Sequence, residues 1–266
     1  MPKTETPGTV DRVHLSTDPV DVVDLLGMNF PETHDPVARV IVQPGVTLLR
    51  ADPFDAGILA LNLAVARSTE TSWLKWRVWP GRTLYVDALT PAPQVAWRLR
   101  RMRREVQRPL PREALTVVTD RGLKLDTPDG RARIERHLDA TGADCLILNP
   151  ALHLRAVSMI ALVAALDHLV QTRTLAILIT HDLGSGLESH ALNDGADRVL
   201  RLERNGDAGV WDLELRQGAK AAPFEKMPLQ RTKETFWFQP FTAAASDRAG
   251  ASPSTSHQPA PARAGA

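Results

Sequence analysis

The sequence predicts a three-layer α/β/α fold whose central sheet is mostly parallel and ends in a β-hairpin. From Val46 onward, short apolar runs alternate with longer helical patterns, which is typical of βαβ units. The runs are apolar on consecutive positions, as in strands that are covered on both faces. The last two runs are joined by the turn-rich link Asn205-Gly206-Asp207-Ala208-Gly209, which is short enough for an antiparallel hairpin.

The apolar runs give the expected order of strands, and the residues between them give the helices. The predicted strands are Val46–Leu49, Thr83–Val86, Leu115–Val118, Cys145–Leu148, Leu175–Ile179, Val199–Leu202 and Trp211–Leu215. Thr127 as a cap, Pro128 in the first turn and Gly142 after the last turn frame one helix. A longer helix is expected from about Ala156 to Thr172. Its predicted apolar stripe consists of Val157, Ile160, Ala164 and Leu169.

Length and composition predict one large domain with polar ends. The chain has 266 residues and 43% hydrophobic content, which suits a sizeable core. We expect a flexible segment at 1–17, the folded domain at 18–240 and a disordered tail at 241–266, because both ends lack large apolar residues. The sequence has no apolar run resembling a signal peptide or membrane span, and the lone Cys145 excludes an internal disulfide. These features predict a cytoplasmic protein that does not associate with membranes.

The charge is balanced overall but locally basic. Lysine and arginine total 32 against 31 acidic residues, so the net charge of +1 neither requires nor excludes a nucleic-acid partner. One helical pattern around Leu99, Met102 and Val106 is interleaved with arginines. These candidate DNA-binding residues are Arg98, Arg100, Arg101, Arg103, Arg104 and Arg108. The alternative is that they form the solvated face of an amphipathic helix.

Several segments in the same order resemble the RecA-like replication ATPases, particularly the RepA plasmid helicase group and, more distantly, the DnaB helicases. The resemblance begins with Pro44-Gly45, an apolar strand and the helical motif LALNLA at 59–64. It continues through GRTLYV at 81–86, ADCLILNP at 143–150, the run ending ITH at 179–181 and GADRVLRL at 195–202. The resemblance implies a RecA-like fold and a nucleotide site at the carboxyl ends of the strands.

The phosphate-binding motif of these ATPases is altered at each defining position. That motif, G-x-x-x-x-G-K-[ST], uses glycines to bring backbone amides to phosphate, a lysine for charge and a hydroxyl for Mg²⁺. Aligning LALNLA places Arg50 at the first glycine, Asp55 at the second, Ala56 at the lysine and Gly57 at the hydroxyl residue. A carboxylate at Asp55 repels phosphate. Shifting the register by two residues does not restore the motif.

The positions for the metal ligand and the general base are also altered. In the resembling ATPases an Asp ends the strand that matches Leu146–Leu148, but Asn149 stands there. A Glu that orients the attacking water is replaced by Leu89, and Asp87 is a conceivable displaced acid. His181 lies where relatives place a polar residue that senses the γ-phosphate, although a structural hydrogen-bonding role is the alternative.

These changes predict a pseudo-ATPase without catalytic residues, without a metal site and without a bound cofactor. Its expected role is that of a non-catalytic subunit in DNA replication, recombination or repair. The expected partners are DNA, another RecA-like or replication or repair protein, or further copies of the same chain. The alternative hypothesis is an active DNA-dependent ATPase that uses non-canonical residues, in which case ATP and Mg²⁺ are its cofactors.

Overall fold

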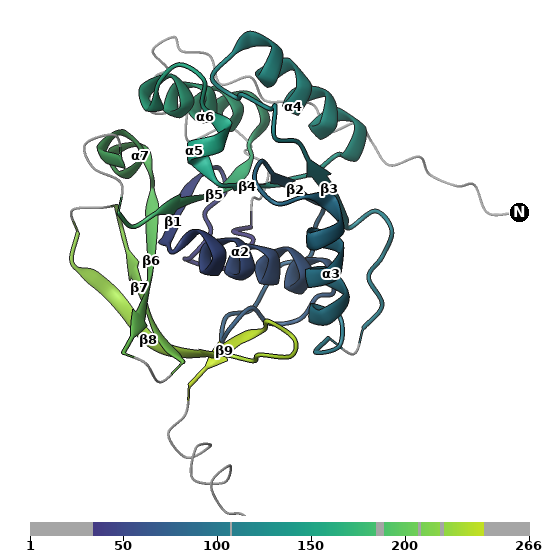
Figure 1. Cartoon of the computed structure of the whole chain (residues 1–266). Coiled ribbons are helices and arrows are strands. Elements are labelled where there is room, and N and C mark those ends of the chain that lie inside the picture. The colour runs from purple at the N-terminus through teal and green to yellow at the C-terminus, as the bar shows by residue number, and fades with distance from the viewer. Residues whose placement is uncertain (1–33, 107, 185–188, 207–208, 219–220, 242–266) are drawn as a thin grey trace, which may run out of the picture.

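The computed structural model describes residues 34–106, 108–184, 189–206, 209–218 and 221–241. These residues form a single sheet with the strand order β3-β2-β4-β5-β1-β6-β7-β8-β9 (Figure 1). The strands are β1 (Gly45–Ala51), β2 (Thr83–Asp87), β3 (Leu115–Thr119), β4 (Cys145–Asn149), β5 (Ala176–Asp182), β6 (Arg198–Asn205), β7 (Val210–Arg216), β8 (Pro223–Arg231) and β9 (Phe238–Pro240). The predicted segment at 1–17 lies outside the described residues, as does the predicted tail apart from Phe241.

Helices cover both faces of the sheet, as the sequence predicts. They are α2 (Pro53–Ser68), α3 (Ala92–Met102), α4 (Pro128–Thr141), α5 (Ala151–Leu154), α6 (Met159–Arg173) and α7 (Ser189–Gly195). Helices α2 and α3 lie on one face, and α4, α5 and α6 lie on the other (Figure 1). Each face has its own apolar core. In the part of the chain that the structure describes, none of the helices combines the length and apolar character needed to span a bilayer.

The predicted parallel strands and the hairpin are confirmed, but the antiparallel part of the sheet is larger than predicted. Strands β6 and β7 form the expected hairpin. Strand β8 then pairs with β7, and β9 pairs with β8, both antiparallel. Only Leu229–Arg231 pairs with β9, so the segment of β8 that contains Pro223 and Pro228 has one unpaired edge. Proline is tolerated at such an edge because it has no amide to donate.

Helix α2 is enclosed by the sheet rather than merely lying on it. Strands β6 to β9 curve around the helix, so that β9 lies across it from the parallel strands (Figure 1). Every residue from Asp55 to Ser68 is consequently buried. This enclosure explains why the sequence of α2 is apolar almost all the way round, which is typical of a fully buried helix. Its beginning therefore lies within a packed environment that β7, β8 and β9 help to form.

The ends of α4 agree with the prediction, but the buried stripe of α6 does not. The Thr127 hydroxyl accepts from the Gly130 amide, and Gly142 ends α4 in the left-handed conformation. The predicted stripe of α6 is wrong except at Leu169, because Val157 and Ile160 are each 74% exposed and Ala164 is exposed. Ser158 caps the helix. The face that meets the sheet consists of Met159, Leu162, Ala165, Leu166 and Leu169.

Candidate functional site

The candidate site lies at the carboxyl ends of the parallel strands, where ligands bind in open α/β sheets. The strand register brings together residues that the sequence singled out separately. Asp87 at the end of β2 is paired with Asn149 at the end of β4. Arg50 near the end of β1 is paired with His181 of β5. The sheet therefore collects the positions predicted for a general base, a metal ligand and a γ-phosphate sensor along one edge.

A chain of buried hydrogen bonds links three of these strand ends. The Asn149 side-chain nitrogen donates to Asp87 Oδ2 at 3.0 Å. The Thr180 hydroxyl donates to Asn149 Oδ1 at 2.7 Å. All three side chains are at most 2% exposed. Asn149 thus bridges β2 and β5, with its amide nitrogen facing a carboxylate and its oxygen facing a hydroxyl.

The remaining lone pairs of Asp87 also accept hydrogen bonds. The backbone amides of Leu89 and Thr90 donate to Oδ1 at 2.9 and 2.6 Å, and the Tyr85 hydroxyl donates to Oδ2 at 3.2 Å. Burial, followed by the neighbouring Asp87 carboxylate, raises the pKa of Tyr85 well above its ordinary value of 10, so its hydroxyl keeps its proton. Leu89 itself is 38% exposed and contributes only its amide to this cluster.

The connection from β1 to α2 is a single residue, Asp52. Asp52 caps the helix, because its side chain accepts from the Phe54 amide at 3.0 Å. Pro53 occupies the first helical position, where it has no amide to donate. The Ala56 amide already donates to the Asp52 carbonyl at 2.8 Å. The first turn of α2 therefore follows the strand directly and binds its own cap.

Asp55 is held by two side chains from distant strands. Its carboxylate forms an ion pair with Arg231 at the end of β8. It also accepts from the Trp211 indole nitrogen of β7 at 2.8 Å. Asp55 is 5% exposed, so the pair is buried against the first turn of α2. One turn further into the interior, Gly57 packs on Asn149, since a Cβ added to Gly57 would lie 3.1 Å from the Asn149 nitrogen.

Arg50 and His181 lie on the other side of the same edge. Arg50 donates to the Leu183 carbonyl at 2.9 Å. Burial, followed by the positive charge of Arg201 beside it on β6, lowers the pKa of Arg50 below its ordinary value of 12.5, although it remains far above neutral pH. His181 is 2% exposed, so it belongs to the interior of the sheet edge rather than to its surface.

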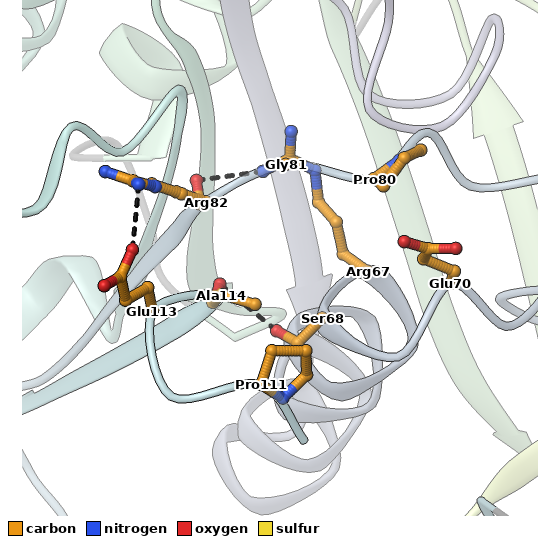
Figure 2. A pocket seen from close by; sticks show the side chains of 9 residues that line it. All are labelled: Arg67, Ser68, Glu70, Pro80, Gly81, Arg82, Pro111, Glu113 and Ala114. Atoms are coloured by element: carbon orange, nitrogen blue, oxygen red, sulfur yellow. Dashed lines mark hydrogen bonds and ion pairs between the residues drawn. The ribbon is translucent and has the colours of Figure 1, made fainter. Parts of the chain in front are cut away.

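A pocket of about 260 Å³ lies at the opposite end of the sheet. Figure 2 shows its lining, which includes Arg67 and Ser68 from the end of α2 and Arg82 and Ala114 from the residues just before β2 and β3. Arg67 is buried and forms a bidentate ion pair with Asp144, at 2.9 and 2.7 Å. This pocket is therefore separate from the carboxyl ends of the strands, where the predicted site residues lie.

The predicted basic helix is confirmed as α3, on the same face of the sheet as α2 (Figure 1). Arg98, Arg100 and Arg101 are part of α3, whereas Arg103, Arg104 and Arg108 follow its end. Arg100, Arg103, Arg104 and Arg108 are exposed, while Arg98 and Arg101 are partly covered. The two partly covered arginines lie over aromatic rings, Arg98 at 5.0 Å from the Phe54 centroid and Arg101 at 4.5 Å from that of Trp97.

The sequence reasoning missed the contribution of β7, β8 and the residues before β9. Trp211 and Arg231 bind Asp55, and Phe236 lies 6.2 Å from Phe54 between ring centroids. Phe54 stands within the altered phosphate-loop segment, and that position was the available signal. Nothing in the local pattern around Arg231 or Phe236 indicates that these residues reach α2.

Two solved structures share this fold. The KaiC-like protein PH0186 from the hyperthermophilic archaeon Pyrococcus horikoshii OT3 matches with a TM-score of 0.57 and 12% identity, covering 78% of this chain and 94% of that chain. The ATPase domain of a helicase matches with a TM-score of 0.58 and 10% identity, covering 76% of this chain and 86% of that chain. No family model matches the sequence, and no curated protein does. At these identities the likeness concerns the fold alone, and it is the RecA-like fold of P-loop ATPases, related to that of the DnaB-type helicases.

Proposed function

We propose that this chain is a RecA-fold protein that does not hydrolyse ATP by the phosphate-loop mechanism. It acts instead as a non-catalytic subunit that binds DNA or another protein in DNA replication, recombination or repair. The fold supports descent from nucleotide-dependent proteins. The resemblance of Pro44-Gly45 and of the helical motif at 59–64 to replicative helicases supports the pathway.

The observation that carries the proposal is the buried ion pair of Asp55 with Arg231. Asp55 occupies the position of the second glycine of a phosphate loop. A triphosphate at this place would meet a carboxylate in a poorly solvated cleft. Reaching that carboxylate would also require separation of a buried ion pair, which costs several kcal/mol. The short connection through Asp52 adds to this, because the cap side chain takes up the Phe54 amide that would otherwise point toward an anion.

The hydrogen bonds of Asp87 argue against its use as a displaced general base. A carboxylate has about four lone-pair directions. Tyr85, Leu89, Thr90 and Asn149 donate one hydrogen bond each to the Asp87 oxygens. A water molecule positioned for attack would have to replace one of these donors. The same holds for a magnesium ion at Asn149, whose oxygen accepts from Thr180.

Thermal unfolding in the presence of nucleotide tests the proposal. If Mg·ATP bound with a dissociation constant of about 10 μM, 1 mM ligand would stabilise the fold by about 2.7 kcal/mol. That corresponds to a Tm increase of roughly 5 to 10 °C for a chain of this size. We expect no increase with Mg·ATP or Mg·ADP, and no phosphate release with or without single-stranded DNA. An established P-loop ATPase assayed in parallel controls for sensitivity.

Two results would contradict the proposal. The first is a clear increase in Tm with 1 mM Mg·ATP. The second is steady phosphate release that Asp87→Ala abolishes, since this would identify Asp87 as a working acid in an unconventional site. Asp212→Ala is the matched control, because Asp212 is an exposed carboxylate on β7 and should have no effect on any phosphate release.

A further inference from the structure

Aromatic and arginine side chains gather where α2 begins, where α3 runs and where the chain returns to β9. We call this the aromatic–arginine surface, and it consists of Phe54, Trp97, Phe236, Arg98, Arg101 and Arg231. Phe54 is 41% exposed and Trp97 is 45% exposed, although both are large apolar side chains. Exposed aromatic residues at this density on one surface mark a binding site more often than a solvent boundary.

The rings and the guanidinium groups are arranged around one another. The Phe236 ring lies 5.1 Å from Trp97 and 6.2 Å from Phe54, measured between centroids. Arg98 and Arg231 lie over the Phe54 ring at 5.0 and 5.1 Å. Arg101 contacts both Trp97 and Phe236. Each ring therefore has a cation beside it, and the three rings form one continuous platform.

The charge of the surface comes from α3 and the residues that follow it. The segment 97–104 contains five arginines and no acidic residue. Arg231 adds little net charge, because it is paired with Asp55. Arg100, Arg103 and Arg104 are exposed beyond the rings. The surface thus offers stacking faces in the middle and uncompensated positive charge to one side.

The loop that carries Phe236 is fixed in place. The Asn62 side chain of α2 donates to the Phe236 carbonyl at 3.2 Å and accepts from the Phe238 amide at 2.8 Å. The Thr232 amide donates to the Trp237 carbonyl, and the Phe236 amide donates to the Thr232 carbonyl. Phe236 adopts a φ of 59°, a conformation that L-residues rarely adopt and that surrounding contacts must maintain. The platform is therefore preorganised.

We propose that the aromatic–arginine surface binds single-stranded nucleic acid. Unpaired bases stack on exposed rings, and the sugar-phosphate backbone follows nearby arginines. A duplex fits less well, because its base faces are already stacked within the helix and unavailable to Phe54 or Trp97. A second copy of this chain would need acidic groups to face the arginines, and the segment 97–104 supplies none. This inference names the partner for the binding role proposed above, and it uses no nucleotide at the strand ends.

Fluorescence anisotropy with a labelled 20-nucleotide single-stranded DNA of mixed sequence tests the proposal, without ATP and at several salt concentrations. Trp97→Ala should weaken binding roughly 5- to 150-fold, because stacking of one base is lost. Arg100→Ala should reduce the slope of log affinity against log salt by about 0.7, the value for one phosphate contact on a single strand. The Tm of each variant is measured first, to establish that it is folded.

Two matched variants separate this site from general surface effects. Phe224→Ala removes an aromatic ring that is 53% exposed, at the other end of β8 and about 20 Å along the strand from Arg231. Arg136→Ala removes an exposed arginine of α4, on the opposite face of the sheet. Both should leave the affinity within about twofold of the wild type, by comparison with the loss expected for one stacked base.

The possible failures are distinct from one another. Absent binding at 50 mM salt, or equal losses in Trp97→Ala and Phe224→Ala, overturns this inference while leaving the absence of ATP hydrolysis untouched. Equal affinity for heparin, which has charge but no bases, also overturns it. A dimer in light scattering that Trp97→Ala dissociates would assign the surface to a second copy of the chain. A Tm increase with Mg·ATP would refute the proposed non-catalytic role without bearing on DNA binding.

Discussion

Asn149 and Asp87 lie side by side at the ends of neighbouring parallel strands, and the Asn149 amide nitrogen donates to the Asp87 carboxylate at 3.0 Å. Asn149→Asp would restore the acid that ATPases of this type carry at this strand end, but it would replace a donor with a second buried carboxylate. We expect the free energy of unfolding to fall by several kcal/mol at pH 7. Urea unfolding measures the loss.

The pH dependence of Asn149→Asp identifies its cause. Two adjacent buried carboxylates raise the pKa of the pair, because both cannot be charged together. A group whose pKa is raised in the folded state favours folding at low pH, so the loss should shrink as the pH falls from 7 toward 5. Asn205→Asp is the control, since the Asn205 amide also donates to a carboxylate, Asp212, but at an exposed position. A loss of the same size in both variants would contradict the role of burial.

Removing the partner of Arg67 should be costly. The Arg67 side chain is 1% exposed, while Asp144, its bidentate partner, is 41% exposed. Asp144→Ala leaves a buried guanidinium without its countercharge and should lower the free energy of unfolding by about 3 kcal/mol. Chemical denaturation of Asp144→Ala and of the double variant Arg67→Met/Asp144→Ala checks this, because the double variant should recover part of the loss.

The neighbouring pair of Arg82 and Glu113 provides the comparison for Arg67. It lines the same pocket (Figure 2), but its side chains are 51% and 80% exposed. Solvent screens such a pair, so Glu113→Ala should change the free energy of unfolding by less than about 1 kcal/mol. If Glu113→Ala and Asp144→Ala proved equally destabilising, burial of Arg67 could not be the reason.

Glu214 on β7 should make stability depend on pH in the acid range. Hydrogen bonds from Lys226 and Arg216 lower the pKa of Glu214 from its ordinary value of 4.5 to about 2. A lowered pKa in the folded state stabilises the fold above the unfolded value, and this contribution is lost as the pH falls from about 4.5 to 2. The effect should be at most about 1 kcal/mol for an ion pair near the surface. Urea midpoints of wild type and Glu214→Gln, measured from pH 6 to 2, should converge at the acid end.

The parallel part of the sheet could be predicted because its strands are apolar on consecutive positions, as in Cys145–Asn149. Strand β8 could not, since Pro223 and Pro228 argue against a strand unless the unpaired edge is known. The stripe of α6 was misplaced because Val157 precedes the Ser158 cap, and a cap position fixes which residues face the sheet.

The candidate site was predictable only where its residues end strands. Asp87 and Asn149 follow apolar runs, and parallel strands necessarily bring such ends together. The ion pair of Asp55 with Arg231 joins residues 176 positions apart. Its formation depends on how β6 to β9 curve around α2, and hydrophobic periodicity within a short window contains no information on that curvature.

Asn62 should couple the stability of α2 to the order of the aromatic–arginine surface. Asn62→Leu keeps the volume but leaves the Phe238 amide and the Phe236 carbonyl without their partner. Each buried group left unsatisfied costs about 1–3 kcal/mol, so we expect a loss of roughly 2–4 kcal/mol in urea unfolding. Hydrogen exchange at the Phe238 amide should become faster, because its acceptor is gone.

Ser68→Ala is the control for Asn62→Leu, on the same buried helix. The Ser68 hydroxyl donates only to carbonyls, those of Ala64 and Ala114, and the Ala114 carbonyl also accepts from the Thr83 amide. Its removal therefore leaves no buried amide without an acceptor and should cost less than about 1 kcal/mol. Equal losses in the two variants, or unchanged exchange at Phe238 in Asn62→Leu, would show that Asn62 does not hold the loop that presents Phe236.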